Sequence, residues 1–289
     1  MLPLRKRKAS PRTSPSAKLA RTTTGVHVAI DTHNIYVARG GKLRSSDVGS
    51  PLLFATQNIK GLVSTRNSKY LLDDSQQLWR DGAKLAERVT AINDHYALDY
   101  QGRVARFGAQ GNLEPFPTTV TIRQLVGDLL LGKDDCLYDS QDRYIVGNVR
   151  SAATDGDDIS ILYHDGRLDF LTANDACRPV LQALLTAVLT ESIVKAVPHA
   201  GSLLVLTANG EIIMSGANTY FESGTAASTV NRLERIAVPR KAIDFDFRCG
   251  VGWALLDDDS VWVWGDNEGG KRFLQWYDEF MITPRLLTL

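Results

Sequence analysis

The chain has few cysteines and no long apolar run. Among its 289 residues are three cysteines, which lie far apart at Cys136, Cys177 and Cys249. An odd and sparse set of cysteines argues against a disulfide framework and favours a reducing compartment. The longest apolar stretch, Val180–Val197, is interrupted by polar and charged residues, whereas a membrane helix needs about 20 consecutive apolar residues. The sequence therefore predicts a globular protein with no membrane span.

Motifs for catalysis and metal binding are also missing. The sequence contains no P-loop, no G-x-S-x-G nucleophile motif and no H-E-x-x-H zinc motif, and its five histidines are scattered. The nearest approach to a calcium loop is Asp155–Gly156–Asp157–Asp158, which lacks the regular spacing and the distal glutamate of such loops. We interpret it as a turn. These features favour a non-enzymatic protein with no metal and no cofactor.

The zero net charge of the chain hides a basic N-terminal arm. Residues 1–24 contain seven Lys or Arg and no acidic residue, and subtracting these seven from the chain's 33 leaves 26 basic against 33 acidic residues in the remainder. The arm is rich in Ser, Thr and Pro, too polar to bury a core of its own. We therefore expect a disordered arm over residues 1–24 and a folded body over residues 25–289.

A dense basic cluster in this arm indicates a nuclear address or a contact with the phosphates of DNA. A mitochondrial presequence is one alternative, but the prolines of the arm would interrupt the amphipathic helix that it requires. A solvated tail without a specific partner, on a cytoplasmic protein, is the other alternative. The nuclear interpretation leads. The cluster consists of Arg5, Lys6, Arg7 and Lys8.

One hairpin pattern recurs along the body. Each copy has an apolar strand, a turn of Asp, Asn, Ser, Gln or Gly, a second strand and, in most copies, a closing glycine. The intervals from Gly82 to Gly108 and from Gly147 to Thr172 are short, so we expect the third and fifth units to have lost or truncated an outer strand. The seven copies are Val26–Gly41, Tyr70–Gly82, Tyr96–Gly111, Cys136–Asn148, Ile159–Thr172, Leu203–Asn218 and Cys249–Gly270.

Seven such hairpins predict an all-β fold, a seven-bladed β-propeller, in preference to a β-sandwich. We expect one helix, Arg178–Lys195, between the fifth and sixth blades. The C-terminal Met281–Leu289 is expected to form an outer strand that pairs with the first blade and closes the ring. Apolar runs ahead of several hairpins supply inner strands, namely Asn58–Val63, Val89–Ile92, Ile193–Val197 and Ala242–Phe247.

Two segments, Ile193–Asn218 and Ala242–Gly270, resemble the repeat of the regulator of chromosome condensation family, whose last strand ends in Trp-Gly-x-Asn. That ending is Trp264–Gly265–Asp266–Asn267 here, and it weakens to Ser215–Gly216–Ala217–Asn218 and Phe107–Gly108–Ala109–Gln110 in other copies. The resemblance implies a seven-bladed propeller. The founding member of the family is an exchange factor for the GTPase Ran that binds nucleosomes, but this chain shows no early insertion like the hairpin wedge of that protein.

The sequence therefore predicts a non-enzymatic platform for protein interactions, nuclear and associated with chromatin through its arm. A nucleotide exchange factor for a Ran-like GTPase is the alternative. The partners implied are proteins, such as a small GTPase or a chromatin complex, with DNA or nucleosome contact through the arm. The acidic turns at Asp73–Asp74, Asp134–Asp135, Asp157–Asp158 and Asp257–Asp259 are expected to make one face negative and suited to a basic partner. Candidate partner-binding aromatic residues are Trp276, Tyr277 and Phe280.

Overall fold

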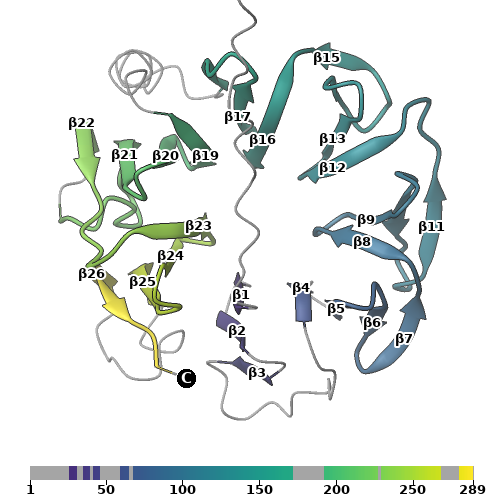
Figure 1. Ribbon diagram of the computed structural model, residues 1–289, viewed down its shortest axis with the longest axis horizontal. Helices are drawn as coiled ribbons and strands as arrows, with labels where there is room; N and C mark the ends of the chain where they lie inside the picture. The colour runs from purple at the N-terminus through teal and green to yellow at the C-terminus, as the bar shows by residue number, and fades with distance from the viewer. Residues whose placement is uncertain are drawn as a thin grey trace, which may run out of the picture.

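Seven antiparallel sheets stand around a common axis in the computed structural model, as Figure 1 shows from above. The structure describes residues 26–30, 35–39, 42–45, 59–64, 68–171, 192–226, 229–267 and 280–288. These residues form strands and turns. None of them belongs to a helix that is long and apolar enough to span a membrane. The predicted seven-bladed β-propeller is confirmed, while the basic arm and most of the predicted helix lie outside the described residues.

Each blade is one sheet, with strands that follow the chain order from the axis outward. The first four blades comprise β1 (Val26–Ile30), β2 (Ile35–Arg39) and β3 (Lys42–Ser45); β4 (Ile59–Ser64), β5 (Lys69–Asp73), β6 (Leu78–Arg80) and β7 (Ala83–Ala86); β8 (Val89–Ile92), β9 (Tyr96–Asp99), β10 (Val104–Phe107) and β11 (Leu113–Phe116); and β12 (Ile122–Val126), β13 (Leu129–Gly132), β14 (Leu137–Tyr138) and β15 (Tyr144–Val146). The remaining blades comprise β16 (Val149–Asp155), β17 (Asp158–Tyr163) and β18 (Leu168–Leu171); β19 (Ile193–His199), β20 (Ser202–Thr207), β21 (Ile212–Ala217) and β22 (Thr229–Arg235); and β23 (Ala242–Arg248), β24 (Val251–Leu256), β25 (Val261–Asp266) and β26 (Phe280–Leu286).

The inner strands share a β-bulge. In six of the seven described inner strands, the pairing with the second strand of the blade skips the second residue, which stands out of the ladder. A bulge changes the direction of the extra residue's side chain. Here it does so at the second residue of the inner strand in six blades. The skipped residues are Lys60, Thr90, Arg123, Arg150, Val194 and Ile243.

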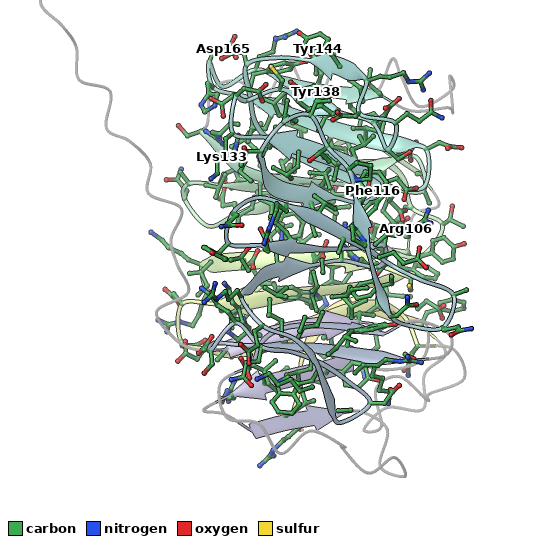
Figure 2. The ribbon with its side chains drawn as sticks, turned by 90° about the vertical axis from the view of Figure 1, so that its right-hand side faces the viewer. Arg106, Phe116, Lys133, Tyr138, Tyr144 and Asp165 are labelled. Carbon is green, nitrogen blue, oxygen red and sulfur yellow. The ribbon has the colours of Figure 1, made fainter. Side chains whose placement is uncertain are left out.

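The core lies between the blades, where apolar faces of neighbouring sheets meet. One cluster joins Leu204 and Met214 of the sixth blade to Phe245 and Trp264 of the seventh, all of them fully buried. Burial stabilises a fold by about 25 cal/mol per Å² of apolar surface, so two-sided packing holds together sheets that would be unstable alone. Figure 2 views these stacked sheets from the edge of the ring.

Side-chain packing also joins the last blade to the first. Val26 and Val37 of the first blade pack against Trp253, Val263 and Met281 of the seventh. The C-terminal segment forms the predicted outer strand, β26, but β26 pairs with β25 of its own sheet. The expectation that it would pair with the first blade is therefore wrong, because the ring closes face to face.

Three other expectations need correction. The third blade keeps four strands, each of four residues, so its length is reduced within the strands and not in their number. Most of the expected hairpins join the second and third strands of their blades, but two do not. The hairpin at Cys136–Asn148 joins the third and fourth strands, and the one at Val26–Gly41 joins the first and second. The predicted helix cannot extend to Lys195, because Ile193–Lys195 begins strand β19.

The inner strands agree with the sequence analysis. Val89–Ile92 forms β8 with the expected bounds, and Ile59–Ser64, Ile193–His199 and Ala242–Arg248 match the other three expected strands to within two residues. The fifth blade has three strands among the described residues, and the segment after it lies outside them.

Candidate protein-binding surface

The ring has two faces that differ in the turns that form them. Because every blade is antiparallel, the turns between first and second strands lie at the same end as those between third and fourth strands. We call this end the inner-turn face, and the other end, which carries the turns between second and third strands, the opposite face. In Figure 2, Lys133 of a second-to-third turn and Arg106, close to a third-to-fourth turn, lie toward different faces.

The acidic turns do not share one face, so the prediction of a single negative face from these turns is wrong. Asp73–Asp74, Asp134–Asp135 and Asp257–Asp259 join second to third strands and belong to the opposite face. Asp157 lies between β16 and β17, on the inner-turn face. The face that a turn occupies depends on which strands it joins, and turn composition does not carry that information.

Cations and backbone groups compensate the acids of the opposite face. Arg123 Nη2 lies 2.9 Å from Asp135 Oδ1, and Arg240 Nε lies 2.7 Å from Asp257 Oδ1. Asp99 Oδ1 accepts hydrogen bonds from the backbone N–H groups of Gln101 and Arg103, at 2.8 and 2.9 Å. These carboxylates hold turns together, as expected for aspartates at such positions.

The inner-turn face carries acids near the axis. Asp94, Asp128, Asp155 and Asp157 belong to first-to-second turns or border them, and the described cations at these turns are Lys69, Arg248 and histidines. Asp128 Oδ1 lies 3.3 Å from His95 Nε2, on an exposed pair that is screened by solvent. Among the described residues of this part of the face, aspartates therefore outnumber lysine and arginine.

The sequence that approaches a calcium loop forms a contact between the fifth and sixth blades. Asp155 Oδ2 lies 2.7 Å from Nδ1 of the buried His199, and Asp158 Oδ2 accepts a hydrogen bond of 2.8 Å from Gly201 N. Burial raises the pKa of Asp155, but the hydrogen bond and charge of His199 outweigh it, so the pKa lies below its ordinary value. The described residues contain no cluster of three His, Cys, Asp or Glu side chains that could hold a metal ion.

The loop after β21 is held by its own side chains. Asn218 Oδ1 accepts a hydrogen bond of 2.8 Å from Ser223 N, and Asn218 Nδ2 donates one of 3.0 Å to Thr225 O. Trp264 of the seventh blade donates from Nε1 to Glu222 O at 3.0 Å. Asn218 and Trp264 both belong to the Trp-Gly-x-Asn endings, so these endings fix a loop and its attachment to the next blade.

This loop presents aromatic side chains on the inner-turn face. Tyr220 is 38% exposed and its ring lies 5.6 Å from that of His199, measured between centroids. Phe221 lies 4.9 Å from Phe280, which is also 38% exposed, at the start of β26. We call Tyr220, Phe221 and Phe280 the aromatic patch.

Phe280 is exposed, as the sequence analysis expected, and its ring lies beside that of Phe221, which shares a loop with Tyr220. Sequence reasoning missed these two, since a loop residue without periodicity gives no sign of its exposure. The one sequence feature that could have indicated this loop was Asn218, the last residue of the repeat ending before it. Trp276 and Tyr277 lie outside the described residues, as do Arg5, Lys6, Arg7 and Lys8.

Solved structures share this fold. A crystal structure of yeast RCC1 (Prp20) bound to Kap60 matches with a TM-score of 0.61 at 13% identity, covering 86% of this chain and 78% of that one. Prp20p from Saccharomyces cerevisiae, described with its binding to Gsp1p and histones, matches with 0.62 at 12% identity, covering 92% and 88%. Human WBSCR16 matches with 0.51 at 15% identity, covering 90% and 77%.

The fold class is therefore a seven-bladed propeller like that of yeast RCC1, and the predicted resemblance is confirmed for the fold. No protein-family model matches the sequence, and no curated protein matches it. At these identities the likeness to solved structures concerns the architecture alone.

Proposed function

We propose that this protein is a non-enzymatic interaction platform that binds a protein partner through the inner-turn face. The observation that carries the proposal is the aromatic patch, in which a fixed loop holds Tyr220 and Phe221 and strand β26 holds Phe280, next to acidic turns. Aromatic residues on a rigid support are the side chains that most often dominate binding energy in protein interfaces. The similar protein Prp20 binds other proteins: it is bound to Kap60 in one structure and is described with its binding to Gsp1p and histones in the other.

The partner is a basic protein. The carboxylates of Asp94, Asp128, Asp155 and Asp157 attract a positively charged segment and speed its association, while the aromatic patch supplies buried contact area. Negative charge around the patch disfavours DNA on this face. Contact with nucleic acid then falls to the basic arm, through Arg5, Lys6, Arg7 and Lys8.

A purified dimer of core histones is a suitable basic probe for this face. Replacing both Tyr220 and Phe280 with Ala should weaken its binding at least about 10-fold, since truncating interface aromatic residues costs about 2 kcal/mol or more. Tyr144→Ala is the matched control, because Tyr144 is 63% exposed on β15 of the fourth blade, away from the patch. Isothermal titration calorimetry measures the affinity of the double variant and of the control for the histone dimer. Equal affinity of the double variant and the wild-type protein contradicts the proposed interface.

The arm supports a nuclear location and association with chromatin as part of the same proposal. Exchange of Arg5, Lys6, Arg7 and Lys8 for Ala should abolish nuclear accumulation of a fluorescent fusion and leave the propeller folded. A fusion that stays nuclear after this exchange contradicts the role of the cluster as an address. A fusion found in mitochondria or in the cytoplasm would support the corresponding alternative.

A nucleotide exchange factor for a Ran-like GTPase is the second candidate, favoured by the likeness to Prp20p, a protein described with its binding to Gsp1p. Release of fluorescent GDP from Gsp1p, measured with a catalytic amount of this protein, separates the two functions. A non-enzymatic platform leaves the release rate at its intrinsic value. Acceleration of about 10-fold or more identifies an exchange factor.

A further inference from the structure

Cations at the bulge position connect neighbouring blades on the side of the axis. Arg123, the skipped residue of β12, donates from Nη2 to Val149 O at 2.8 Å and to Arg150 O at 3.1 Å, both in β16 of the next blade. Arg150, the skipped residue of β16, donates in the same way to Ile193 O at the start of β19. Each of these guanidinium groups satisfies carbonyl groups of the following inner strand.

A lysine makes the corresponding connection between the sixth and seventh blades. Lys195, one residue beyond the bulge of β19, lies with Nζ 2.9 Å from Asp244 Oδ1 and 2.5 Å from Phe245 O. Three successive junctions are therefore closed by a cation of one blade and acceptors of the next.

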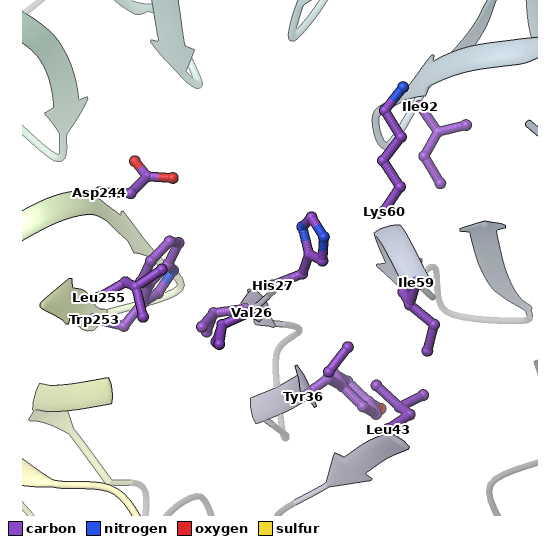
Figure 3. Close-up of a pocket in the computed structure, with 13 residues that line it drawn as sticks. Val26, His27, Tyr36, Leu43, Ile59, Lys60, Ile92, Asp244, Trp253 and Leu255 are labelled. Atoms are coloured by element: carbon purple, nitrogen blue, oxygen red, sulfur yellow. The ribbon is translucent and has the colours of Figure 1, made fainter. Parts of the chain in front are cut away.

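The second blade differs from the fourth, fifth and sixth, whose cations make these connections. Lys60 is the skipped residue of β4 and is exposed, and among the described residues its Nζ has neither a hydrogen bond nor an ion pair. It borders a pocket of about 250 Å³ that opens between β1, β4 and β24. Figure 3 shows the ring of His27 projecting between Lys60 on one side of this pocket and Asp244 on the other.

The pocket combines an apolar floor with two polar groups that have no hydrogen-bonding partner among the described residues. The two groups are the ammonium of Lys60 and the imidazole of the half-buried His27. Burial lowers the pKa of His27, so the ring is neutral at pH 7 and offers one N–H donor. The charges that act on it are Asp74, Lys60 and Asp244. The floor consists of Val26, Ala38, Leu43, Ile59, Ile92 and Leu255.

The carboxylate of Asp244 does not strongly repel an anion in the pocket, because it is paired. Its partner is Lys195, at 2.9 Å, and the Lys195 ammonium also lies 6.0 Å from the centre of the Trp253 ring. The pair compensates the negative charge on that wall. The ammonium of Lys60 is then the cation that a bound anion would meet in the pocket, since it has no ion-pair partner among the described residues.

We propose that this pocket binds a small carboxylate with an apolar body, with the carboxylate on Lys60 and His27 and the body on the floor. A volume of about 250 Å³ lies just below the usual range of ligand pockets, about 300–1,000 Å³, and suits a group the size of a phenylalanine side chain. The carboxylate belongs either to a free organic acid or to the C terminus of a peptide with an apolar last residue. The pocket is separate from the aromatic patch, and its function does not depend on the proposed interface.

Titration of the full chain with phenylacetate tests this proposal. Histidine resonances followed by NMR should show His27 shifting on binding, and the pKa of His27 should rise, because a bound anion favours the protonated ring. Phenylacetamide, which has the same shape without the charge, should bind at least about 10-fold more weakly, the difference expected for a charge-assisted hydrogen bond.

Two variants and two peptides complete the experiment. Lys60→Met should weaken phenylacetate at least about 10-fold, whereas Lys84→Met, which removes an exposed lysine from outer strand β7, should leave it unchanged. Circular dichroism confirms that both variants are folded. Gly-Gly-Phe with a free C terminus and its amide then distinguish the sources: tighter binding of the free peptide than of phenylacetate identifies a peptide C terminus, and weaker binding identifies a small acid. Equal binding of phenylacetate and phenylacetamide, or unchanged affinity in Lys60→Met, overturns the proposal.

Discussion

Arg248, the last residue of β23, lies 3.6 Å through Nη1 from Asp94 Oδ2 in the turn after β8, so an ion pair connects the seventh blade to the third across the axis. Arg248 Nε also lies 3.2 Å from Asp246 Oδ2 in its own strand. Both members of the pair across the axis are about half exposed, at 50% for Arg248 and 55% for Asp94. The pair spans the axis on the inner-turn face.

A double-mutant cycle measures this pair. Arg248→Gln, Asp94→Asn and the double variant should give a coupling free energy of about 0.2–1 kcal/mol in urea unfolding, the range of exposed ion pairs. The coupling should fall as salt is raised, because exposed charges are screened. Using a cycle removes the separate contribution of Asp246. Zero coupling at low salt would mean that the two side chains do not interact in solution.

The glycine of the Trp-Gly-x-Asn ending is required by the backbone that approaches it. Gly265 has a φ of +103°, and a Cβ there would lie 2.3 Å from Gly250 O; Gly216 has a φ of +115° and would place a Cβ 2.5 Å from Gly201 O. Both oxygens belong to the first-to-second turn of the same blade, which also accepts a hydrogen bond from the next residue, Asp266 or Ala217. In the sixth and seventh blades the repeat signature therefore records a close contact inside the blade.

Replacing Gly265 with Ala should destabilise the protein by about 3 kcal/mol or more, because backbone strain and a collision with backbone add together. Gly166→Ala is the matched control. Gly166 has a φ of +88° with no atom near the added Cβ, so it should cost about 1 kcal/mol from strain alone. Urea unfolding of both variants checks the difference. Similar losses in the two variants would show that the approach of Gly250 O is not what requires the glycine.

Strands and their repetition could be predicted from the sequence, but their exact place in a blade could not. The alternation that identifies β8 or β24 is local, whereas two successive turns of one blade look alike. Lys133–Asp135 joins β13 to β14 and Asp139–Arg143 joins β14 to β15, and both are short polar turns rich in aspartate. The hairpin expected at Cys136–Asn148 contains the second of these turns, so it was placed one strand too far along the blade. The short interval after Gly147 came from this shift.

The sites were less predictable than the fold because they are assembled from different blades. The contact of Asp155 with His199 joins residues of two blades, and the pocket beside Lys60 uses side chains from four blades. Neither arrangement leaves a pattern at a fixed spacing in the sequence. Phe280 could be proposed because it follows the glycine break of the last blade, but its partner Phe221 could not.

Asp155 should make the stability depend on pH on the acid side. Its pKa is lower in the folded protein than in the unfolded chain, so its contribution is present above the unfolded pKa and is lost as pH falls through the folded pKa. Asp155→Asn should therefore destabilise the protein at pH 7 and have less effect at the acid end of the folded range. Urea unfolding between pH 3 and 7 measures the difference. A loss that is the same at every pH would mean that the charge of Asp155 does not contribute.

Glu222 should make the stability depend on pH in the opposite direction to Asp155. It is fully buried, its Oε2 accepts a hydrogen bond of 2.9 Å from Tyr220 N, and its Oε1 has no hydrogen-bonding partner among the described residues. Burial raises the pKa of this carboxyl, so the folded state holds its proton to a higher pH than the unfolded chain does, and stability falls as pH rises from the unfolded pKa through the folded one.

Glu222→Gln keeps an acceptor for Tyr220 N and removes the ionisable group. The variant should therefore gain stability relative to the wild-type protein between pH 4 and pH 7, as the buried carboxyl of the wild type becomes ionised. Asp266→Asn, on the same face, is a control for charge removal, because the pKa of Glu222 is governed first by its burial. Urea midpoints at the two pH values give the comparison. A relative stability of Glu222→Gln that stays constant, or falls, from pH 4 to pH 7 would show that Glu222 is not a buried acid with a raised pKa.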